Sequence, residues 1–536
     1  MPILHIDLRK IDNNYVELRY FRDNPNQYDS RQVSLNEIQQ QINLINRDYY
    51  EDYNIQPEDY ARIGQVLYNF LDGSERFLQK AIDEYSRDGL VLAIATSEEL
   101  AHLPWEILHD GKKFLVEKKP GIILPLRWNP DKSNPLEEQN QPKNSALNVL
   151  FMATSPIDSN LPELDFEEEE ARILKATSGK PLSLIVEESG CLEEMHSLIE
   201  TYYQRNYFDV FHLTGHTGEK DGNTYFITET ELGEKKYSSA EDIAEALGFP
   251  MPKLIFLCGC QTGYSPRKGT VQSMAEALLM EGANAVLGWG KKVSDKDATE
   301  AAANLYEKLS GGYTVIEAIA TTYRTLIKNK ATGWHLLRFY VAKTLPGQLV
   351  ERGQESIPRN SFTTEFFDSE GKVRVANRES FIGRRRQLQN CLRSLKISSS
   401  EIGVLIHGMG GLGKSTIAAR LCDRLSGHKK IVWWRQIDEP SLVKKLADHL
   451  QSQEQRTLLR GNQEELKQRL KRAFNTLGRS VLVFDDFEWN LKPRDQGYVL
   501  NPDAAEVLSA LIWAIRNQEN ITHHRIIITS RYDFEF

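Results

Sequence analysis

The sequence has few cysteines and no long apolar run, and each absence excludes a class of protein. Its five cysteines in 536 residues are too few and too scattered for a disulfide framework, and the pair Cys258 and Cys260 lacks the spacing of a metal-binding motif. We therefore expect reduced thiols. No stretch approaches the roughly 18 uninterrupted apolar residues of a membrane-spanning helix, which argues against an integral membrane protein.

Nor does the chain carry an excess of basic charge. Its 66 Lys and Arg residues against 75 Asp and Glu residues give a net charge of -9, which predicts neither nucleic acid nor an anionic membrane as a main partner. The first residues show neither the basic region nor the apolar region of a secretion signal. We expect a cytoplasmic protein that is long enough for about two to four domains.

Short apolar runs alternate with segments of helical periodicity from Gly89 onward. This alternation predicts an α/β fold with a mostly parallel sheet that is covered on both faces. The expected strands are 147–153, 183–186, 208–213, 253–257 and 285–288, and the expected helices are 167–175, 192–203, 240–247, 271–281 and 298–309.

The pattern divides the chain into four parts. Residues 1–85 form an N-terminal α/β lead-in without recognisable chemistry, and the first main domain spans 86–345 with its last strand at 334–341. The polar stretch 346–378 is interpreted as a linker. A second α/β block follows over 379–536.

The second block contains a phosphate-binding loop, the least ambiguous motif in the chain. The apolar strand 402–406 leads into Gly408-Met-Gly410-Gly411-Leu-Gly413-Lys414-Ser415-Thr416, and a helical pattern follows over 417–425. The glycines let backbone N–H groups wrap phosphates, Lys414 can reach the β and γ oxygens, and Ser415 can ligate Mg²⁺. We predict a site for ATP or ADP with Mg²⁺.

Two further strands of this block end in polar residues that suit the same site. The apolar run 480–484 ends in Asp485 and Asp486, of which Asp485 is the predicted Mg²⁺ partner. The run 525–528 leads to Arg531, which could sense the γ-phosphate or could be a solvated loop arginine. Glu488 is either a water-positioning residue or an acid at a helix start, so that hydrolysis of ATP stays open.

The second block resembles the STAND class of P-loop NTPases, the NB-ARC and NACHT relatives. The resemblance rests on Phe381-Ile382-Gly383-Arg384-Arg385, the loop 408–416, the double acid at 485–486 and the run Ile-Thr-Ser-Arg that ends at Arg531, in that order. It implies switching between a closed ADP state and an open, homo-oligomeric ATP state, with Ile382, Gly383 and Arg384 on the adenine side. It also implies helical and winged-helix parts beyond Phe536, so that we expect 379–536 to be C-terminally incomplete.

Two strands of the first block each end at a reactive side chain in a Gly-rich loop. The run 208–213 leads into Thr-Gly-His216-Thr217-Gly218, and the run 253–257 leads into Cys-Gly-Cys260-Gln-Thr-Gly. Because the carboxyl ends of parallel strands hold ligands in open α/β sheets, His216 and Cys260 are candidates for one site. Their separation along the chain is close to that in caspase-type proteases.

The chemistry of a cysteine peptidase suits these positions. His216 would draw the thiol proton and later protonate the leaving amine, while Cys260 attacks the scissile carbonyl. Backbone N–H groups of Cys260 and Thr217, followed by Gly218, would hold the oxyanion.

Three nearby residues have simpler interpretations. We expect His212 to be a hydrogen-bonded structural histidine and Cys258 a small buried apolar residue. Asp297 could select a basic substrate side chain, but a helix cap is the interpretation that we prefer.

The motifs around this pair resemble the CHAT family, a caspase-like group related to separase. The matching segments are Leu103-Pro-Trp-Glu106, His212-Leu-Thr-Gly-His216, Leu257-Cys-Gly-Cys-Gln-Thr-Gly263, Ala283-Asn-Ala-Val-Leu-Gly-Trp289 and the strand from Trp334. The resemblance implies a caspase-hemoglobinase-like fold with His216 and Cys260 as peptidase dyad. Many relatives have Gly directly after the histidine, where this chain has Thr217.

Two functions of different class follow. One is a nucleotide-regulated cysteine endopeptidase of a signalling or defence type, which is gated by the P-loop module and acts on a protein substrate. The other is a non-proteolytic STAND switch in which the CHAT-like block is an interaction domain. The intact His216 and Cys260 favour the first function, whereas Thr217 and the incomplete NTPase block keep the second open.

Overall fold

The computed structural model describes the chain except for a set of short segments. These are residues 13, 35–42, 44–56, 97–99, 130–133, 157–165, 203–206, 221–222, 260–272, 292, 356–363, 382, 397–400, 426, 519–523 and 536. The chain forms two compact units, Met1–Arg359 and Asn360–Phe536.

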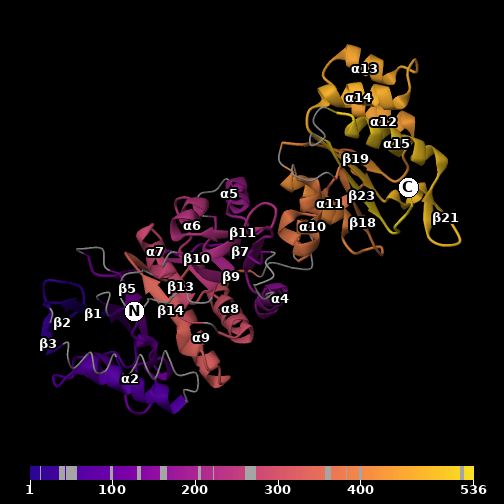
Figure 1. The fold of residues 1–536 in the computed structure, drawn as a ribbon. Coiled ribbons are helices and arrows are strands. Elements are labelled where there is room, and N and C mark those ends of the chain that lie inside the picture. Colours follow the sequence, from indigo (N-terminus) through magenta and orange to yellow (C-terminus); the bar gives the residue numbers. More distant parts are fainter. Residues whose placement is uncertain are drawn as a thin grey trace. The chain divides into compact units, whose positions relative to one another are not determined.

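The first unit is built on one large, mostly parallel sheet (Figure 1). Strand β9 lies at its centre, because its first half pairs in parallel with both β7 and β12. From β12 the order continues through β13, β14, β5, β4, β1, β2 and β3, and β8 lies outside β7. The bounds are β1 (Ile3–Lys10), β2 (Tyr15–Phe21), β3 (Asp29–Ser34), β4 (Leu90–Ala95), β5 (Ile123–Trp128), β7 (Leu147–Ala153), β8 (Leu182–Glu187), β9 (Val210–Lys220), β12 (Leu254–Gly259), β13 (Ala285–Trp289) and β14 (Leu337–Val341).

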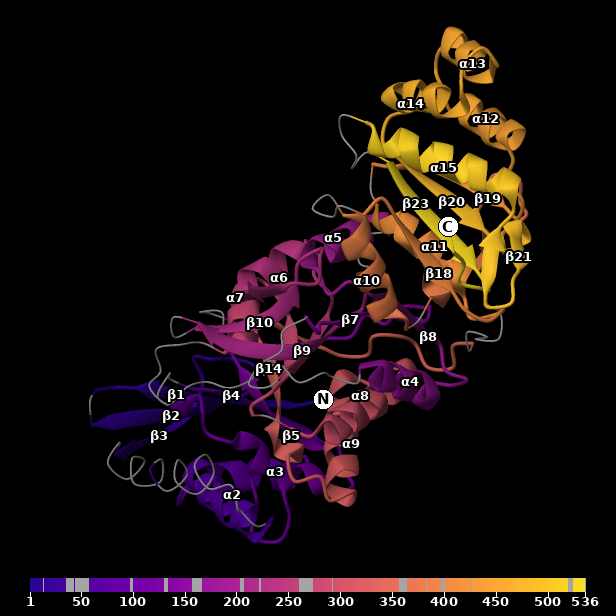
Figure 2. The ribbon, with the colours of Figure 1, turned by 45° about the vertical axis from the view of Figure 1, so that its right-hand side comes forward.

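Helices cover both faces of this sheet, as Figures 1 and 2 show. Side chains alternate along each central strand, so that Val149 and Phe151 of β7 join one apolar cluster and Leu150 and Met152 join the other. One face carries α5 (Leu192–Thr201), α6 (Ala240–Leu247) and α7 (Met274–Met280), and the other carries α4 (Phe166–Ala176), α8 (Asp295–Ser310) and α9 (Val315–Lys328). Helices α2 (Pro57–Asp72) and α3 (Phe77–Glu84) pack in the same cluster as β1 and β4.

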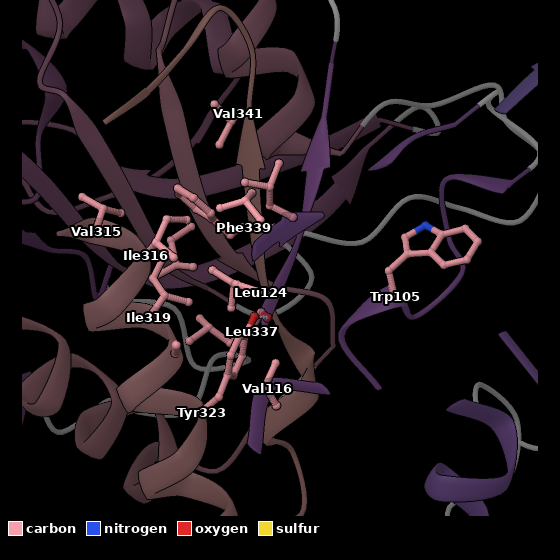
Figure 3. Close-up of a cluster of buried hydrophobic side chains, with 14 of the residues drawn as sticks. Trp105, Val116, Leu124, Val315, Ile316, Ile319, Tyr323, Leu337, Phe339 and Val341 are labelled. Atoms are coloured by element: carbon pink, nitrogen blue, oxygen red, sulfur yellow. Dashed lines mark hydrogen bonds between the residues drawn. The ribbon is translucent and has the colours of Figure 1, made fainter. Parts of the chain in front are cut away.

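Helix α9 shows how one apolar face holds a helix on the sheet. Figure 3 shows Val315, Ile316 and Ile319 beside the side chains of β14. The buried Tyr323 donates a hydrogen bond from its hydroxyl to the Leu337 carbonyl. Fully burying an aliphatic side chain such as that of Ile316 or Ile319 stabilises the folded state by about 1.5–3 kcal/mol.

The Leu-Pro-Trp-Glu motif anchors a short helix to the sheet. Glu106 lies in η3 (Trp105–Ile107) and binds the guanidinium of Arg127 on β5 through both carboxylate oxygens, each at 2.9 Å. A second buried guanidinium, that of Arg338 on β14, lies 4.0 Å from the same carboxylate. The motif therefore has a structural role in this chain, because a buried carboxylate must be paired.

The second unit is a three-layer α/β domain with a parallel sheet in the order β18-β23-β20-β19. Helices α10 and α11 pack on one face, and α12, α14 and α15 pack on the other. The bounds are α10 (Arg385–Leu395), β18 (Gly403–His407), α11 (Lys414–Arg424), β19 (Lys429–Trp434), α12 (Glu439–Asp448), α13 (Gln453–Arg460), α14 (Leu466–Leu477), β20 (Ser480–Asp485), α15 (Pro502–Arg516) and β23 (His524–Ser530).

The stretch interpreted as a linker, 346–378, differs from that expectation. Strand β15 (Thr344–Pro346) pairs with β6 (Glu137–Gln139) in the first unit, and β16 (Thr364–Phe366) and β17 (Arg374–Ala376) form a hairpin in the second. The hairpin is ordered because Phe367, Val373 and Val375 are buried in the cluster that contains α11. These apolar residues lie within a charged stretch, which is why the composition indicated a linker.

Two expectations from composition can be compared with the structure. The four cysteines that the structure describes, Cys191, Cys258, Cys391 and Cys422, form no disulfide. Within the described parts of the chain, no helix combines the length and the apolar character that a bilayer crossing needs.

Candidate active site

His216 lies within a strand and not, as the sequence predicted, in a loop. Strand β9 continues past Gly215 to Lys220, and its second half pairs antiparallel with β10 (Asn223–Glu229), where His216 is opposite Ile227. Gly215 marks a close approach of two elements, because a Cβ there would lie 1.9 Å from the hydroxyl of Thr154. A glycine required by packing was thus taken for a strand end.

The register of β9 and β12 brings the two predicted catalytic segments side by side. Cys258 is opposite Thr214 and Gly259 is opposite Gly215. The last residue of β12 is therefore paired with the residue that directly precedes His216. The hydroxyl of Thr214 donates a 3.4 Å hydrogen bond to the Cys258 carbonyl. Cys260 lies outside the described residues, and its pairing with His216 stays a prediction.

The predicted oxyanion donors Thr217 and Gly218 lie on the same strand as His216. They are opposite Phe226 and Tyr225 of β10. Both residues lie beyond Gly215, the last residue of β9 that pairs with β12, and their role as oxyanion donors remains a prediction.

A buried polar cluster joins α4, β9 and β12 and consists of Glu169, His212 and Cys258. Nε2 of His212 is 3.4 Å from Oε1 of Glu169 on α4, and the Cys258 sulfur is within 4.8 Å of donor atoms on both. His212 is fully buried, as expected for a structural histidine, but neither of its ring nitrogens has a hydrogen-bond partner among the described residues. Cys258 is buried, as expected. Glu169 was missed, since nothing in the sequence pairs a helix acid with a histidine on a later strand.

The acids after β13 have a structural position different from the one expected. The N-cap of α8 is Ser294, whose hydroxyl accepts a 3.1 Å hydrogen bond from the Asp297 N–H. Asp297 is therefore not the cap. It lies with Asp295 in the first helical turn, where the helix dipole stabilises carboxylates.

The loop between β18 and α11 has the backbone geometry of a phosphate cradle. Gly408, Gly411 and Gly413 have φ values of 147°, 80° and 82°, which favour glycine and turn consecutive N–H groups toward one centre. Gly410 completes the loop. Nζ of Lys414 donates to the carbonyls of Gly408 and Met409 at 2.9 and 3.0 Å, so that its positive charge lies over the loop where phosphate oxygens would accept.

Oxygen atoms of Ser415, Asp485 and Thr529 form a hydrogen-bonded group at the start of α11 and the ends of β20 and β23. Asp485 is buried, accepts a 2.7 Å hydrogen bond from Thr529 and is hydrogen-bonded by Ser415. Burial raises the pKa of Asp485, while these two hydrogen bonds act in the opposite direction. Ser415 and Asp485 thus form a hard-oxygen pair that fits a Mg²⁺ ion with phosphates. Thr416 is next to Ser415 at the start of α11.

Asp486 and Arg531 are held by different partners. Asp486 accepts a 3.2 Å hydrogen bond from the Trp434 indole, which leaves Asp485 as the better metal partner. Nε of Arg531 pairs with Glu488 at 3.0 Å, and a Cβ built on Gly410 would lie 3.5 Å from the Arg531 guanidinium carbon. Arg531 therefore adjoins the phosphate loop, although its side chain is 59% exposed, and its role as a γ-phosphate sensor stays a prediction.

The predicted adenine-side residues lie at the start of α10. Gly383 and Arg384 both have positive φ, 77° and 63°, and Arg384 is the N-cap of α10. This helix shares its apolar cluster with α11. Ile382 lies outside the described residues, and contact with adenine stays a prediction for all three.

The strand, the glycine loop, Lys414 and the acids after β20 define the second unit as a P-loop NTPase domain, and residues 380–511 match the AAA ATPase domain family. Residues 61–365 match the CHAT domain family, over more than half of the chain. The chain belongs to the CHAT domain family. The sequence resemblance to this family, the P-loop assignment and the α/β fold class are confirmed, while membership of the STAND class stays a prediction.

No curated protein matches the chain. Among solved structures, the chain is similar to the Saccharomyces cerevisiae separase-securin complex at 15% identity and a TM-score of 0.29, over 48% of this chain and 16% of that chain. It is also similar to the Arg-specific cysteine proteinase gingipain R at 12% identity and a TM-score of 0.34, over 59% of this chain and 76% of that chain.

Proposed function

We propose that this chain is a cysteine endopeptidase of the CHAT type, with Cys260 as nucleophile and His216 as base, and that ATP and ADP regulate it in a signalling or defence response. The observation that carries the proposal is the register of β9 and β12. It pairs Gly259, the last residue of β12, with Gly215, which directly precedes His216. A nucleophile and its base must come within hydrogen-bond reach, and this register supports the proposal because Cys260 follows Gly259 in the sequence, just as His216 follows Gly215.

In the proposed reaction, His216 takes the thiol proton of Cys260, and the sulfur attacks the carbonyl carbon of the scissile peptide bond. Backbone N–H groups of Thr217 and Cys260 stabilise the oxyanion. The C–N bond then breaks, and the leaving amine receives the proton from His216. Water attacks the resulting thioester with His216 as base, which releases a carboxylic acid and restores the thiol.

The second unit would hold the nucleotide through residues whose positions fit it. Backbone N–H groups of the glycine loop and Lys414 would bind the phosphates, while Ser415 and Asp485 would hold Mg²⁺. A bound ATP supplies a γ-phosphate charge that ADP lacks. Arg531, beside Gly410, would respond to that difference by exchanging Glu488 for the phosphate. Homo-oligomerisation in the ATP state is part of this proposal.

A thiol-reactive peptide probe tests the peptidase directly. Labelling should occur at Cys260, vanish in Cys260→Ala and slow by about 10²–10⁴-fold in His216→Ala, which is the usual contribution of a general base. Cys191→Ala is the matched control, because this buried thiol lies outside the site. Equal labelling rates in wild type and His216→Ala would contradict the dyad.

The placement of His216 inside a paired strand favours a second candidate, a nucleotide switch in which the CHAT domain binds partners without cleaving them. A β-ladder engages backbone N–H groups, and Thr217 and Gly218, whose N–H groups are predicted to hold the oxyanion, are paired with Phe226 and Tyr225 of β10. No labelling of Cys260 with intact nucleotide binding would support this candidate.

A further inference from the structure

Three side chains from separate elements converge in the core of the first unit: Glu169 from α4, His212 from β9 and Cys258 from β12. Their exposed fractions are 5%, 0% and 9%. One donor atom from each, an oxygen, a nitrogen and a sulfur, lies within 4.8 Å of the other two. Nothing in the proposed peptidase reaction or in nucleotide binding uses them.

The cluster contains polar groups that protein contacts do not satisfy. Both ring nitrogens of His212, Oε1 of Glu169 and the hydroxyl of Tyr306 are buried without a hydrogen-bond partner among the described residues. Apolar rings enclose the imidazole instead, with Phe256 stacked at 4.7 Å and Phe151 edge-on at 4.9 Å between centroids. A buried polar group without a partner is destabilising, so a bound species that satisfies several of these groups at once would stabilise the cluster.

The donor set selects the kind of species. A thiolate, a carboxylate and a neutral imidazole together carry two negative charges. One divalent cation neutralises them, so that no net charge is buried in the core. Mg²⁺ and Ca²⁺ require mainly oxygen donors, whereas Zn²⁺ and its neighbours accept sulfur, nitrogen and oxygen together.

The geometry agrees with this choice. Bond lengths of about 2.0–2.3 Å in a tetrahedral zinc site place ligand atoms about 3.3–3.8 Å apart. The separation of 3.4 Å between Nε2 of His212 and Oε1 of Glu169 is in that range, although it is long for a charge-assisted hydrogen bond. The Cys258 sulfur lies within 4.8 Å of both atoms. The ring of Tyr306 borders the cluster, with its centroid 5.7 Å from that of His212.

We propose that Glu169, His212 and Cys258 bind one divalent metal ion of the zinc class. The ion would join α4 to the two strands that lead to the predicted dyad, since His212 precedes His216 on β9 and Cys258 lies at the end of β12, two positions before Cys260 in the sequence. Its role is to fix these strands against the helix. The proposal is independent of peptidase activity.

Metal content of the full-length chain tests the proposal. The chain is purified without a histidine tag or added metal, and bound zinc, copper, iron, cobalt and nickel are measured by mass spectrometry of the elements. We expect one ion of this class per chain. Replacement by Co²⁺ should give a thiolate-to-cobalt charge-transfer band in the near ultraviolet, which reports the Cys258 sulfur.

Variants separate this site from the dyad and from the P-loop. Cys258→Ala, His212→Gln and Glu169→Gln should lose the ion, whereas Cys260→Ala, His216→Ala and Cys191→Ala should retain it. If these core variants fail to fold, the wild-type stoichiometry and cobalt spectrum still decide. A wild-type chain that contains no such ion and binds none on titration would overturn the proposal and leave a His212–Glu169 ion pair. Metal retained at full stoichiometry in folded Cys258→Ala would overturn it as well.

Discussion

Arg531 pairs with Glu488 through a 3.0 Å contact between Nε and Oε1, at the edge of the phosphate loop. The Arg531 N–H also donates to Glu488 at 3.2 Å, so that both the backbone and the side chain of Arg531 are held by one carboxylate. Because a phosphate can replace a carboxylate as the partner of a guanidinium, the proposed function predicts that a bound γ-phosphate displaces Glu488 from Arg531.

Arg531→Ala should weaken ATP binding more than ADP binding. The lost interaction is one charge-assisted contact to the γ-phosphate, worth about 1.5–3 kcal/mol, or about 10–150-fold in affinity. Calorimetric titration with each nucleotide measures the ratio. Arg494→Ala removes a similar exposed ion pair with Glu535 and is the control. A loss of equal size for both nucleotides would show that Arg531 does not distinguish them.

Lys414→Ala should weaken ADP and ATP binding alike. Nζ of Lys414 already lies over the loop, within 3.0 Å of two of its carbonyls, and its removal takes away the fixed positive charge at the phosphates. We expect a loss of at least about 10-fold for each nucleotide. Unchanged ADP affinity would contradict the phosphate-loop assignment. Lys467→Ala, at an exposed ion pair with Glu465, provides the matched control.

Glu106→Gln should destabilise the first unit strongly. The buried carboxylate binds Arg127 at two points and lies near Arg338, and breaking a buried pair from one side costs about 3–5 kcal/mol. Denaturant unfolding should show this loss in the transition of the first unit. Glu84→Gln, which breaks an exposed pair with Arg22, should leave the stability nearly unchanged, because solvent screens an exposed ion pair. Similar effects for the two variants would be inconsistent with the buried network.

Acid should destabilise the first unit partly through His335. Burial lowers the pKa of His335 from 6.5 to about 3. The unfolded chain therefore binds a proton as pH falls below 6.5 while the folded chain does not, and the free energy of unfolding falls by about 2 kcal/mol between pH 7 and pH 5.

The variant His335→Phe tests whether His335 causes the fall in the free energy of unfolding at low pH. It keeps an aromatic ring between Tyr60 and Trp334. Its free energy of unfolding should depend less on pH than that of the wild type, by the same amount over the same interval. His196→Phe changes a half-exposed histidine and should leave the dependence unchanged. A parallel pH profile for wild type and His335→Phe would contradict the prediction.

Local patterns predicted the regular elements well. The strand 147–153 and the helix 240–247 coincide with β7 and α6, because alternating burial along a strand and a capped amphipathic helix both leave a local signature. The P-loop was equally visible, since its strand, glycines and helix are contiguous.

Long-range packing accounts for what the sequence did not reveal. Gly215 was interpreted as a strand end because the hydroxyl of Thr154, which excludes a side chain there, comes from a residue that is far away in the sequence. Thr154 directly follows β7, the neighbour of β9 in the sheet. The same holds for Glu169 and His212, which only the packing of α4 on the sheet brings together. Ser294 caps α8 in place of Asp297 because the helix begins earlier than its apolar periodicity does.

The most direct test of the central claim is the rate at which a thiol-reactive peptide probe labels Cys260 in the presence of MgATP and of MgADP. If nucleotide binding at the P-loop controls a cysteine peptidase, the two rates should differ by about 10-fold or more, the effect of a coupling free energy near 1.4 kcal/mol. The difference should disappear in Lys414→Ala, while labelling itself persists. Equal labelling rates under saturating MgATP and MgADP in the wild type would contradict the account.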